Sequence, residues 1–256
     1  MTVRYETAGP IAIVTIDRLD VANAVDAETA ERLVEAFQRF DADPELSVAI
    51  LTGAGGKFSA GGDLKAMMEG RGITVRPDGP GPLGPTRMML SKPVIAAVEG
   101  HAVAGGLELA LWCDLRVAAR DAVFGVYCRR WGIPLCDGGT VRLPRLIGQS
   151  HALDMILTGR GVGGEEAARM GLVNRLCEPG EALETTRRLA MSLARLPQAC
   201  LRSDRRSMYE QWETDLMTAL RRESELGLEV IGSGEVATGL THWRSGAWSF
   251  SDFSEA

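Results

Sequence analysis

The sequence predicts an α/β protein with a helical C-terminal extension. Short β-branched segments alternate with segments of helical period as far as residue 195, which is the pattern of helices packed on a sheet. After residue 180 the apolar residues follow a helical period and no clear strand signal appears. The 256 residues are 45% hydrophobic and 24% charged, as in an ordinary globular protein. We therefore expect a core over residues 1–195 and a helical region over 196–256.

The N-terminal segments predict strands that lead into helices. Residues 2–17 predict two strands on either side of a Gly-Pro turn, because β-branched residues are abundant there. Apolar residues at three- and four-residue spacing predict a helix over 26–40, with Asp26 as its N-cap. A buried strand at 47–53 then runs through a glycine-rich loop into a short helix at 63–68.

The middle of the chain begins with an irregular segment. Residues 70–85 are crowded with glycine and proline, so we expect no regular element there and a mobile or partly disordered segment. A strand at 93–100 follows, and then extended segments at 115–120 and 122–126. Further along, the pattern predicts helices at 138–146, 149–158 and 164–170 and a strand at 172–178.

The C-terminal region predicts helices only. One helix closes at Pro197, two more are expected between 198 and 231, and a short one near 235–243. No repeat is visible at the level of residue identity.

Charge and cysteine content exclude several classes of function. The net charge of -6 disfavours binding to nucleic acid or to an anionic membrane surface. The five cysteines and three histidines show no zinc-ligand spacing, so we predict no metal site and free thiols in a reducing compartment. No apolar run reaches the ~20 residues of a transmembrane helix. We therefore expect a cytoplasmic protein that binds neither nucleic acid nor membrane.

Two short segments approach known signatures and fail at one position. LTGAGGKF follows a strand, but Phe58 stands where a dinucleotide fingerprint needs its last glycine. The same Phe58 stands where a P-loop needs Ser or Thr after Lys57. GQSHA ends in Ala152 where a nucleophile elbow has glycine.

Two glycine loops repeat one arrangement of strand, small-residue loop and helix start. They are ILTGAGGKFSAGGDLKAM (50–67) and IAAVEGHAVAGGLELAL (95–111). Small side chains leave backbone N–H groups open at a helix N-terminus, where they favour negative charge. Donors converging from the two loops would form an oxyanion hole. Tight turns packed against neighbouring backbone would explain the same glycines.

Glu108 is a carboxylate in the apolar run that follows the second loop. A buried charge costs several kcal/mol unless it is paired or hydrogen-bonded. The residue is therefore either a first-turn glutamate that interacts with the helix dipole or a side chain that faces a functional cavity.

Four segments together resemble the enoyl-CoA hydratase/isomerase (crotonase) superfamily. FSAGGDLKAM resembles the signature F-x-A-G-x-D-[LI]-K-x-M, and EGHAVAGGLELALWCDLRVA resembles G-x-[AV]-x-G-G-G-x-E-L-x-x-x-C-D. RLPRLIGQSHALDMILTGRGVGGEEAARMGLVNRL resembles a third family block, and DRLDVANAVD resembles the loop N-R-P-x-x-x-N-A-[LM]. The resemblance covers residues 10–195, and the helical tail is similar to the family's trimerisation region.

The resemblance implies a spiral of ββα units that binds an acyl-CoA thioester and needs no separate cofactor. It implies a homotrimer or a dimer of trimers, assembled through residues 196–256. Two backbone N–H groups, here Ala60 and Gly105, would stabilise the thioester oxyanion. Asp20 stands where the family often has a basic residue. The implied substrate-binding positions are Arg18, Val21, Ala22, Ala60, Gly61, Gly62, Asp63, Leu64 and Gly105.

The implied catalytic positions depart from the hydratase pattern. Glu108 matches the first of two hydratase glutamates, but Cys128 occupies the position of the second. Cys128 is read either as a proton shuttle or as a small buried side chain. Asp137 is read either as a catalytic carboxylate or as the N-cap of the next helix. The neighbouring Arg129 and Arg130 would pair with these carboxylates or with an acidic substrate, or form a solvated or inter-subunit pair.

Three functions follow from this resemblance. The first is an enoyl-CoA hydratase with Glu108 as its main acid and base. The second is an isomerase, or another enolate chemistry, that uses Glu108 and Asp137. The third is a non-catalytic acyl-CoA-binding protein.

Overall fold

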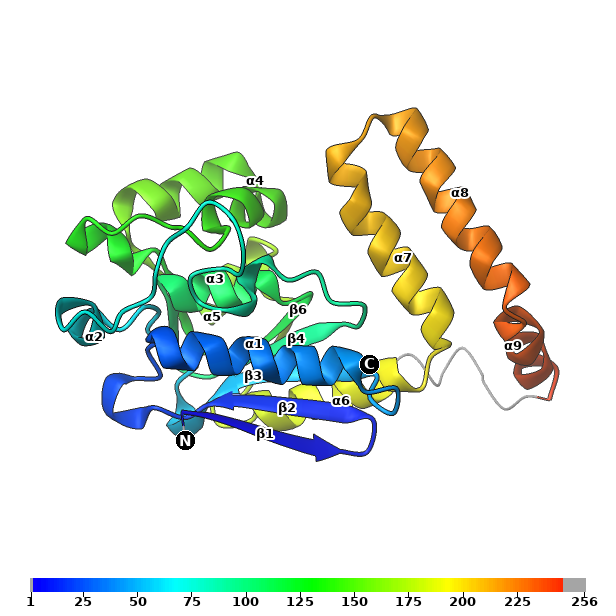
Figure 1. Ribbon diagram of the computed structural model, residues 1–256, viewed down its shortest axis with the longest axis horizontal. Coiled ribbons are helices and arrows are strands. Elements are labelled where there is room, and N and C mark those ends of the chain that lie inside the picture. The colour runs from blue at the N-terminus through cyan, green and yellow to red at the C-terminus, as the bar shows by residue number, and fades with distance from the viewer. Residues whose placement is uncertain (1, 246–256) are drawn as a thin grey trace.

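The computed structural model describes residues 2–245 and contains two β-sheets surrounded by helices (Figure 1). The strands are β1 (Val3–Ala8), β2 (Ile11–Ile16), β3 (Val48–Gly53), β4 (Val94–Val98), β5 (His101–Val103), β6 (Leu115–Ala119), β7 (Val123–Gly125), β8 (Gly161–Gly163) and β9 (Arg175–Cys177). The larger sheet has the order β1-β2-β3-β4-β6-β9, and the smaller one β5-β7-β8. β1 is antiparallel to β2, whereas the later neighbours in the large sheet are parallel.

The helices follow the strands along the chain, and α3 and α4 each complete a repeated unit. They are α1 (Ala27–Ala42), α2 (Leu64–Met68), α3 (Gly105–Trp112), α4 (Gly139–Thr158), α5 (Gly164–Arg169), α6 (Ala182–Ala194), α7 (Gln198–Glu210), α8 (Leu216–Gly232) and α9 (Glu235–Arg244). In β4-β5-α3 and again in β6-β7-α4, the first strand joins the large sheet and the second joins the small one. This ββα unit is the one that the sequence resemblance implies.

The large sheet is covered on both faces, which explains its continuous apolar strands. Alternate side chains point to opposite faces of a strand. Ile13 and Ile50 therefore pack in the cluster under α6, which includes Leu189. Leu51 packs on the other face in the cluster that includes Phe37 of α1.

Helix starts follow the expected capping chemistry. Asp26 is the N-cap of α1, and its carboxylate accepts a hydrogen bond of 2.9 Å from the Thr29 N–H. Asp63 caps α2 in the same way and accepts from the Ala66 N–H at 3.0 Å. The predicted cap at Asp26 is thus confirmed.

Several boundaries differ from the sequence prediction. The expected helices 138–146 and 149–158 form one element, α4, which is interrupted at Gly148 with φ 77° and ψ 160°. Strands β5 and β8 were not predicted, because three residues are too few to establish a period of two. The strand expected at 172–178 covers only Arg175–Cys177.

The glycine- and proline-rich segment divides into two parts. Residues 70–84 contain no helix or strand, as predicted. Residues 81–86, however, are all buried, which contradicts the expectation of a mobile segment at this end.

The C-terminal helices α7, α8 and α9 stand apart from the two sheets as an arm (Figure 1). They fit the three helices expected between residues 198 and 243. The predicted helical region extends to residue 256, and its last part, 246–256, lies outside the described residues.

Candidate active site

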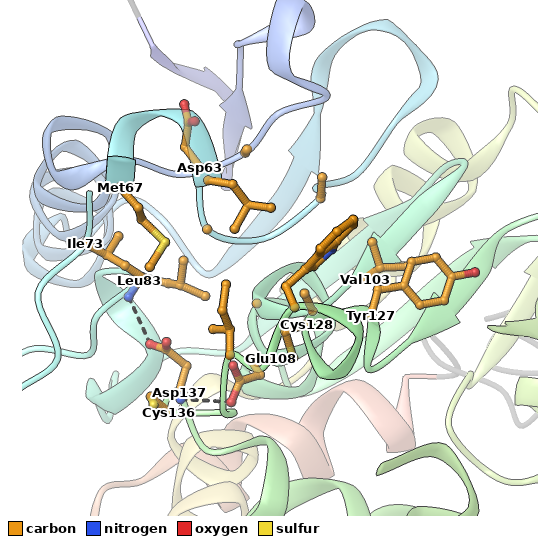
Figure 2. A pocket seen from close by; sticks show the side chains of 18 of the residues that line it. Asp63, Met67, Ile73, Leu83, Val103, Glu108, Tyr127, Cys128, Cys136 and Asp137 are labelled. Atoms are coloured by element: carbon orange, nitrogen blue, oxygen red, sulfur yellow. Dashed lines mark hydrogen bonds between the residues drawn. The ribbon is translucent and has the colours of Figure 1, made fainter. Parts of the chain in front are cut away.

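A cavity of about 600 Å³ lies where the two glycine loops meet. Its wall includes residues from the first glycine loop, the segment 73–83, the start of α3, and the chain between β7 and α4. Figure 2 shows the side chains of Glu108, Cys128, Cys136 and Asp137 gathered on one side of it. The cavity thus brings together all three side chains that the sequence selected as catalytic candidates.

Glu108 enters this cavity from the first turn of α3. Only 3% of the residue is exposed. Its Oε1 accepts hydrogen bonds of 2.8 Å from the backbone N–H groups of Asp137 and Gly139, at the start of α4. The Cys136 backbone also contributes a hydrogen bond to this carboxylate. The Glu108 carboxylate is therefore held by main-chain donors while the residue lines the cavity.

Burial controls the protonation of Glu108. Desolvation raises the pKa of this carboxyl from 4.5 to about 7. The charge of Asp137 raises it further, whereas the hydrogen bond from Gly139 opposes the increase. A carboxyl group with this pKa can accept or donate a proton near neutral pH, as a general acid–base catalyst requires.

The first glycine loop has a different free donor from the one expected. The Ala60 N–H donates to the carbonyl of Ala22 at 3.1 Å, and the Gly61 N–H donates to the Ser59 hydroxyl oxygen. The Gly62 N–H has no acceptor among the described residues. The sequence-based choice of Ala60 as a donor is thus not supported, because its N–H is already bonded. The resemblance located the loop but not which amide within it points away from neighbouring backbone.

The second loop leaves Gly105 in a comparable position. Its N–H has no acceptor in the described protein, and both Gly62 and Gly105 line the cavity. The loops touch through backbone, since a Cβ on Gly61 would lie 2.6 Å from the Gly105 nitrogen. Only glycine permits this approach. Tight packing and open donors, which the sequence presented as alternatives, therefore occur together.

Asn23 holds the first loop in shape, a role that sequence reasoning missed. The residue is fully buried with φ 56°, in the left-handed region that Asn tolerates better than most residues. Its side-chain amide donates to the carbonyls of Ala54 and Lys57 at 2.9 and 2.7 Å. Its own carbonyl accepts from the Ser59 hydroxyl at 2.8 Å. The asparagine in DRLDVANAVD was the available signal.

Arg18 also stabilises the first glycine loop, through ion pairs in the protein interior. Its guanidinium pairs with Asp26 at 2.8 Å and with Asp63 at 3.0 Å. The Arg18 side chain therefore pairs with the two buried carboxylates that cap α1 and α2, and it does not line the cavity. This arrangement does not support Arg18 as a direct ligand of CoA.

The other expected substrate-binding residues divide into two groups. The residues that line the cavity are Val21, Ala60, Gly62, Asp63, Leu64 and Gly105. Ala22 and Gly61 do not line it and instead contribute backbone hydrogen bonds. Lys65 also lines the cavity and was not selected from the sequence.

Cys128 occupies the cavity wall as a buried residue. Its exposure is 7%, and burial together with the Glu108 charge raises the pKa of its thiol. The thiol is therefore protonated at neutral pH. This environment favours the interpretation of Cys128 as a small buried side chain over that of a proton shuttle.

Asp137 is not a helix cap. Gly138, with φ 94°, is the N-cap of α4, and no side chain caps it. The Asp137 carboxylate instead turns toward the segment 81–86, where it accepts hydrogen bonds from the Leu83 N–H at 2.9 Å and from the Thr86 hydroxyl. Burial raises the pKa of Asp137. The capping alternative is therefore wrong.

The two adjacent arginines point away from the carboxylates. Arg129 donates to the carbonyl of Ile156, and Arg130 donates to that of Gly159 while its guanidinium stacks 3.9 Å from the Tyr127 ring centre. The expected alternative of a pair with Glu108 or Asp137 is therefore not observed.

The described residues contain neither a metal-binding cluster nor a helix that could span a membrane. Within residues 2–245, no group of three or more His, Cys, Asp or Glu side chains is arranged to hold a metal ion. In the same part of the chain, no helix has the length and apolar character to cross a membrane. The five cysteines are free thiols.

Comparisons with known proteins identify the family of the chain. A family model for enoyl-CoA hydratase/isomerase matches residues 6–247. Carnitinyl-CoA dehydratase of Salmonella typhi is 48% identical over 191 residues, which span 72% of this chain and 71% of that protein.

Solved structures are similar over almost the whole chain. Enoyl-CoA hydratase EchA1 from Mycobacterium marinum is 38% identical, with a TM-score of 0.90, and the match covers 95% of this chain and 96% of the other. A Geobacillus kaustophilus hydratase structure is 31% identical, with a TM-score of 0.84 and coverage of 96% and 95%. The chain therefore belongs to the enoyl-CoA hydratase/isomerase family of acyl-CoA enzymes and has the crotonase fold.

Proposed function

We propose that this protein catalyses the reversible addition of water to a 2-enoyl-CoA, with Glu108 as the acid and base. The observation that supports this most directly is the Glu108 carboxylate itself. Two backbone N–H groups hold one of its oxygens, and Glu108 lines a cavity that Gly62 and Gly105 also line. The named relatives, a carnitinyl-CoA dehydratase and enoyl-CoA hydratases, act in the same type of chemistry.

The Gly62 and Gly105 N–H groups form the proposed oxyanion hole. They would donate to the thioester oxygen, which gains negative charge when water attacks the enoyl group. Preorganised donors of this kind contribute about 2.7–4 kcal/mol each to transition-state stabilisation. Gly62 replaces the predicted Ala60 in this role, because the Ala60 N–H is bonded to Ala22.

One carboxylate is sufficient for the proton balance. Ionised Glu108 removes a proton from water as the water oxygen bonds to C3 of the enoyl group. The C2–C3 π electrons move toward the thioester, giving an enolate held by the two N–H groups. Protonated Glu108 then returns the proton to C2, and the thioester C=O is restored. Dehydration of a 3-hydroxyacyl-CoA is the reverse sequence.

The activity test is hydration of crotonyl-CoA, followed as loss of enoyl absorbance. Because the reaction needs ionised Glu108, kcat/KM for hydration should fall as the pH drops below about 7. Dehydration of carnitinyl-CoA is the second assay, because the Salmonella relative is a carnitinyl-CoA dehydratase. Retained CoA binding without turnover of either substrate would contradict the proposal.

A second candidate is double-bond isomerisation with Glu108 and Asp137, since Asp137 lines the same cavity. Incubation with 3-enoyl-CoA separates the two, because an isomerase forms the 2-enoyl product without added water. The third reading, a non-catalytic acyl-CoA-binding protein, predicts that Glu108→Gln changes no turnover on any acyl-CoA.

We infer that residues 1–195 bind the acyl-CoA and that the C-terminal helices assemble a homotrimer or a dimer of trimers in the cytoplasm. The reaction as written needs no cofactor besides the CoA of the substrate. The exposed apolar side chains of α8, including Leu228 at 68% and Ile231 at 63%, support the assembly proposal.

A further inference from the structure

The buried end of the irregular segment is attached to the start of α4 by two side chains, of which the first is Asp137. Oδ1 of Asp137 accepts from the Leu83 N–H at 2.9 Å and from the Thr86 hydroxyl (Figure 2 shows the Leu83 bond). Only 2% of Asp137 is exposed, and Thr86 is fully buried. Fifty-one or more residues separate Asp137 from these partners in sequence, so the contact is tertiary.

Arg142 makes a second attachment between the same two segments. Its Nη1 donates to the carbonyl of Asp137 at 2.9 Å, and its Nη2 donates to the carbonyl of Thr86 at 2.7 Å. Asp137, Thr86 and Arg142, which we call the Asp137 cluster, therefore connect the 81–86 segment to the first turn of α4.

The Asp137 cluster contacts both halves of the proposed catalytic apparatus. The Asp137 main chain donates to Glu108 Oε1, as does that of Gly139. The side chain of Leu83 packs directly against Gly105, where a Cβ would lie 2.4 Å from Leu83 Cδ1. A displacement of the 81–86 segment would therefore reach the Gly105 N–H and the cavity wall together.

We propose that Asp137 is a positioning residue, which holds Leu83 behind Gly105 through its side chain and holds the Glu108 carboxylate through its main chain. This inference rests on the proposed hydration reaction. It gives Asp137 a role that differs from both sequence alternatives, because Asp137 neither caps a helix nor exchanges a proton with the substrate.

The hydrogen-bond pattern provides a discriminating set of variants. Both partners donate to the same oxygen, so the amide oxygen of Asp137→Asn can accept both bonds. Asp137→Ala removes both, and Thr86→Val removes one with little change of shape outside the cavity lining. Asp78→Asn, at an exposed carboxylate earlier in the same segment, is the matched control.

The expected kinetics follow this geometry. Asp137→Ala should lower kcat/KM by roughly 100-fold, the scale of a 1 Å misplacement at a reacting centre. Thr86→Val should lower it by roughly tenfold, as expected for loss of one hydrogen bond to a charged group. It should cause no further loss in an Asp137→Ala background, because the two residues share one bond. Asp137→Asn should remain within roughly tenfold of the unmodified protein.

The pH dependence of kcat/KM is a second measurement, and a purely structural role of Asp137 would leave it unchanged. Glu108 is surrounded by Asp137, Cys128, Cys136 and Arg142, and the Asp137 charge is one contribution that raises its pKa. Asp137→Asn should therefore move the acidic limb of kcat/KM to lower pH. Thr86→Val retains that charge and should leave the limb in place.

Hydrogen exchange at the Leu83 amide tests the attachment without reference to activity. Exchange should be faster in Asp137→Ala and close to the unmodified rate in Asp137→Asn and Asp78→Asn. Unchanged exchange in Asp137→Ala would overturn the proposal. So would an Asp137→Asn enzyme as inactive as Asp137→Ala beside a fully active Thr86→Val, since that result makes Asp137 a proton carrier. An unmodified protein that turns over no acyl-CoA contradicts the proposed reaction alone, because exchange still reports on the cluster.

Discussion

At the scale of single residues, Glu108 shows why an active site costs stability. Its carboxylate lies in an apolar helix where only 3% of the residue is exposed, and two hydrogen bonds compensate only part of its desolvation. Ordinary packing would place a neutral side chain here. The proposed catalytic role of Glu108 would account for the exception, because a group that transfers protons has to face the substrate cavity.

Glu108→Gln should therefore stabilise the protein while it lowers turnover. Burial raises the pKa of Glu108 from 4.5 to about 7, so between these values the folded protein holds a proton that the unfolded chain has released. The resulting stability is present below pH 4.5 and is lost as the pH rises to about 7. Glutamine does not titrate, and its advantage should grow over this window to about 3 kcal/mol, the equivalent of the shift.

Chemical denaturation at pH 4 and pH 8 measures this difference. Glu31→Gln, at an exposed position of α1, is the control and should show little change with pH. Hydration by Glu108→Gln should fall by roughly 10²–10⁴-fold, the usual contribution of general acid–base catalysis. A variant less stable than the unmodified protein at pH 8 would contradict the desolvation argument.

At the scale of elements, the start of α3 carries backbone strain beside the proposed oxyanion hole. Ala104 has φ 53° and ψ −125°, a conformation that residues with a Cβ rarely adopt. The family signature has glycine at this position, and the alanine methyl lies close to Gly61, where a Cβ would be 3.1 Å from it. The structure thus keeps an unfavourable residue at the turn that presents Gly105.

Ala104→Gly should raise the free energy of unfolding by about 1 kcal/mol. Relief of strain is worth about 1–3 kcal/mol, and the extra flexibility of unfolded glycine offsets about 0.5–1 kcal/mol of it. Thermal unfolding should show an increase of about 2–4 °C for a chain of this size. Ala102→Gly, on the adjacent strand with no positive φ, is the matched control and should be destabilising. Equal losses in both variants would show that Ala104 is unstrained.

Some of these elements could be predicted from the sequence, whereas details of the site could not. Helix α1 and strand β2 were predictable because their apolar periods are long and local. Which amide of the first glycine loop is free could not be predicted, because this depends on the carbonyl of Ala22 being close enough to accept from Ala60. The role of Asp137 depends likewise on Leu83 and Thr86, which are distant in sequence and carry no motif.

At the scale of the whole molecule, helix α8 has two apolar sides. Leu226 is 3% exposed and belongs to the inner side of the arm. Met217, Leu220, Leu228 and Ile231 are all exposed, and a period of 3.6 residues places these four on the face opposite Leu226. A helix of a monomer needs only one apolar face, and the second face of α8 therefore supports the proposal that another subunit covers it. The expected homotrimer or dimer of trimers would supply a second copy of this chain.

Leu228→Glu combined with Ile231→Glu should therefore dissociate the assembly. Two carboxylates in an apolar contact lose their hydration without gaining partners, which costs several kcal/mol. Light scattering should change from a multiple of the 27.5 kDa chain mass to the single-chain value. Glu223→Gln, at an exposed polar position of the same helix, should leave the mass unchanged. A single-chain mass for the unmodified protein would contradict the assembly itself, whereas an intact oligomer of the double variant would assign the contact to another surface.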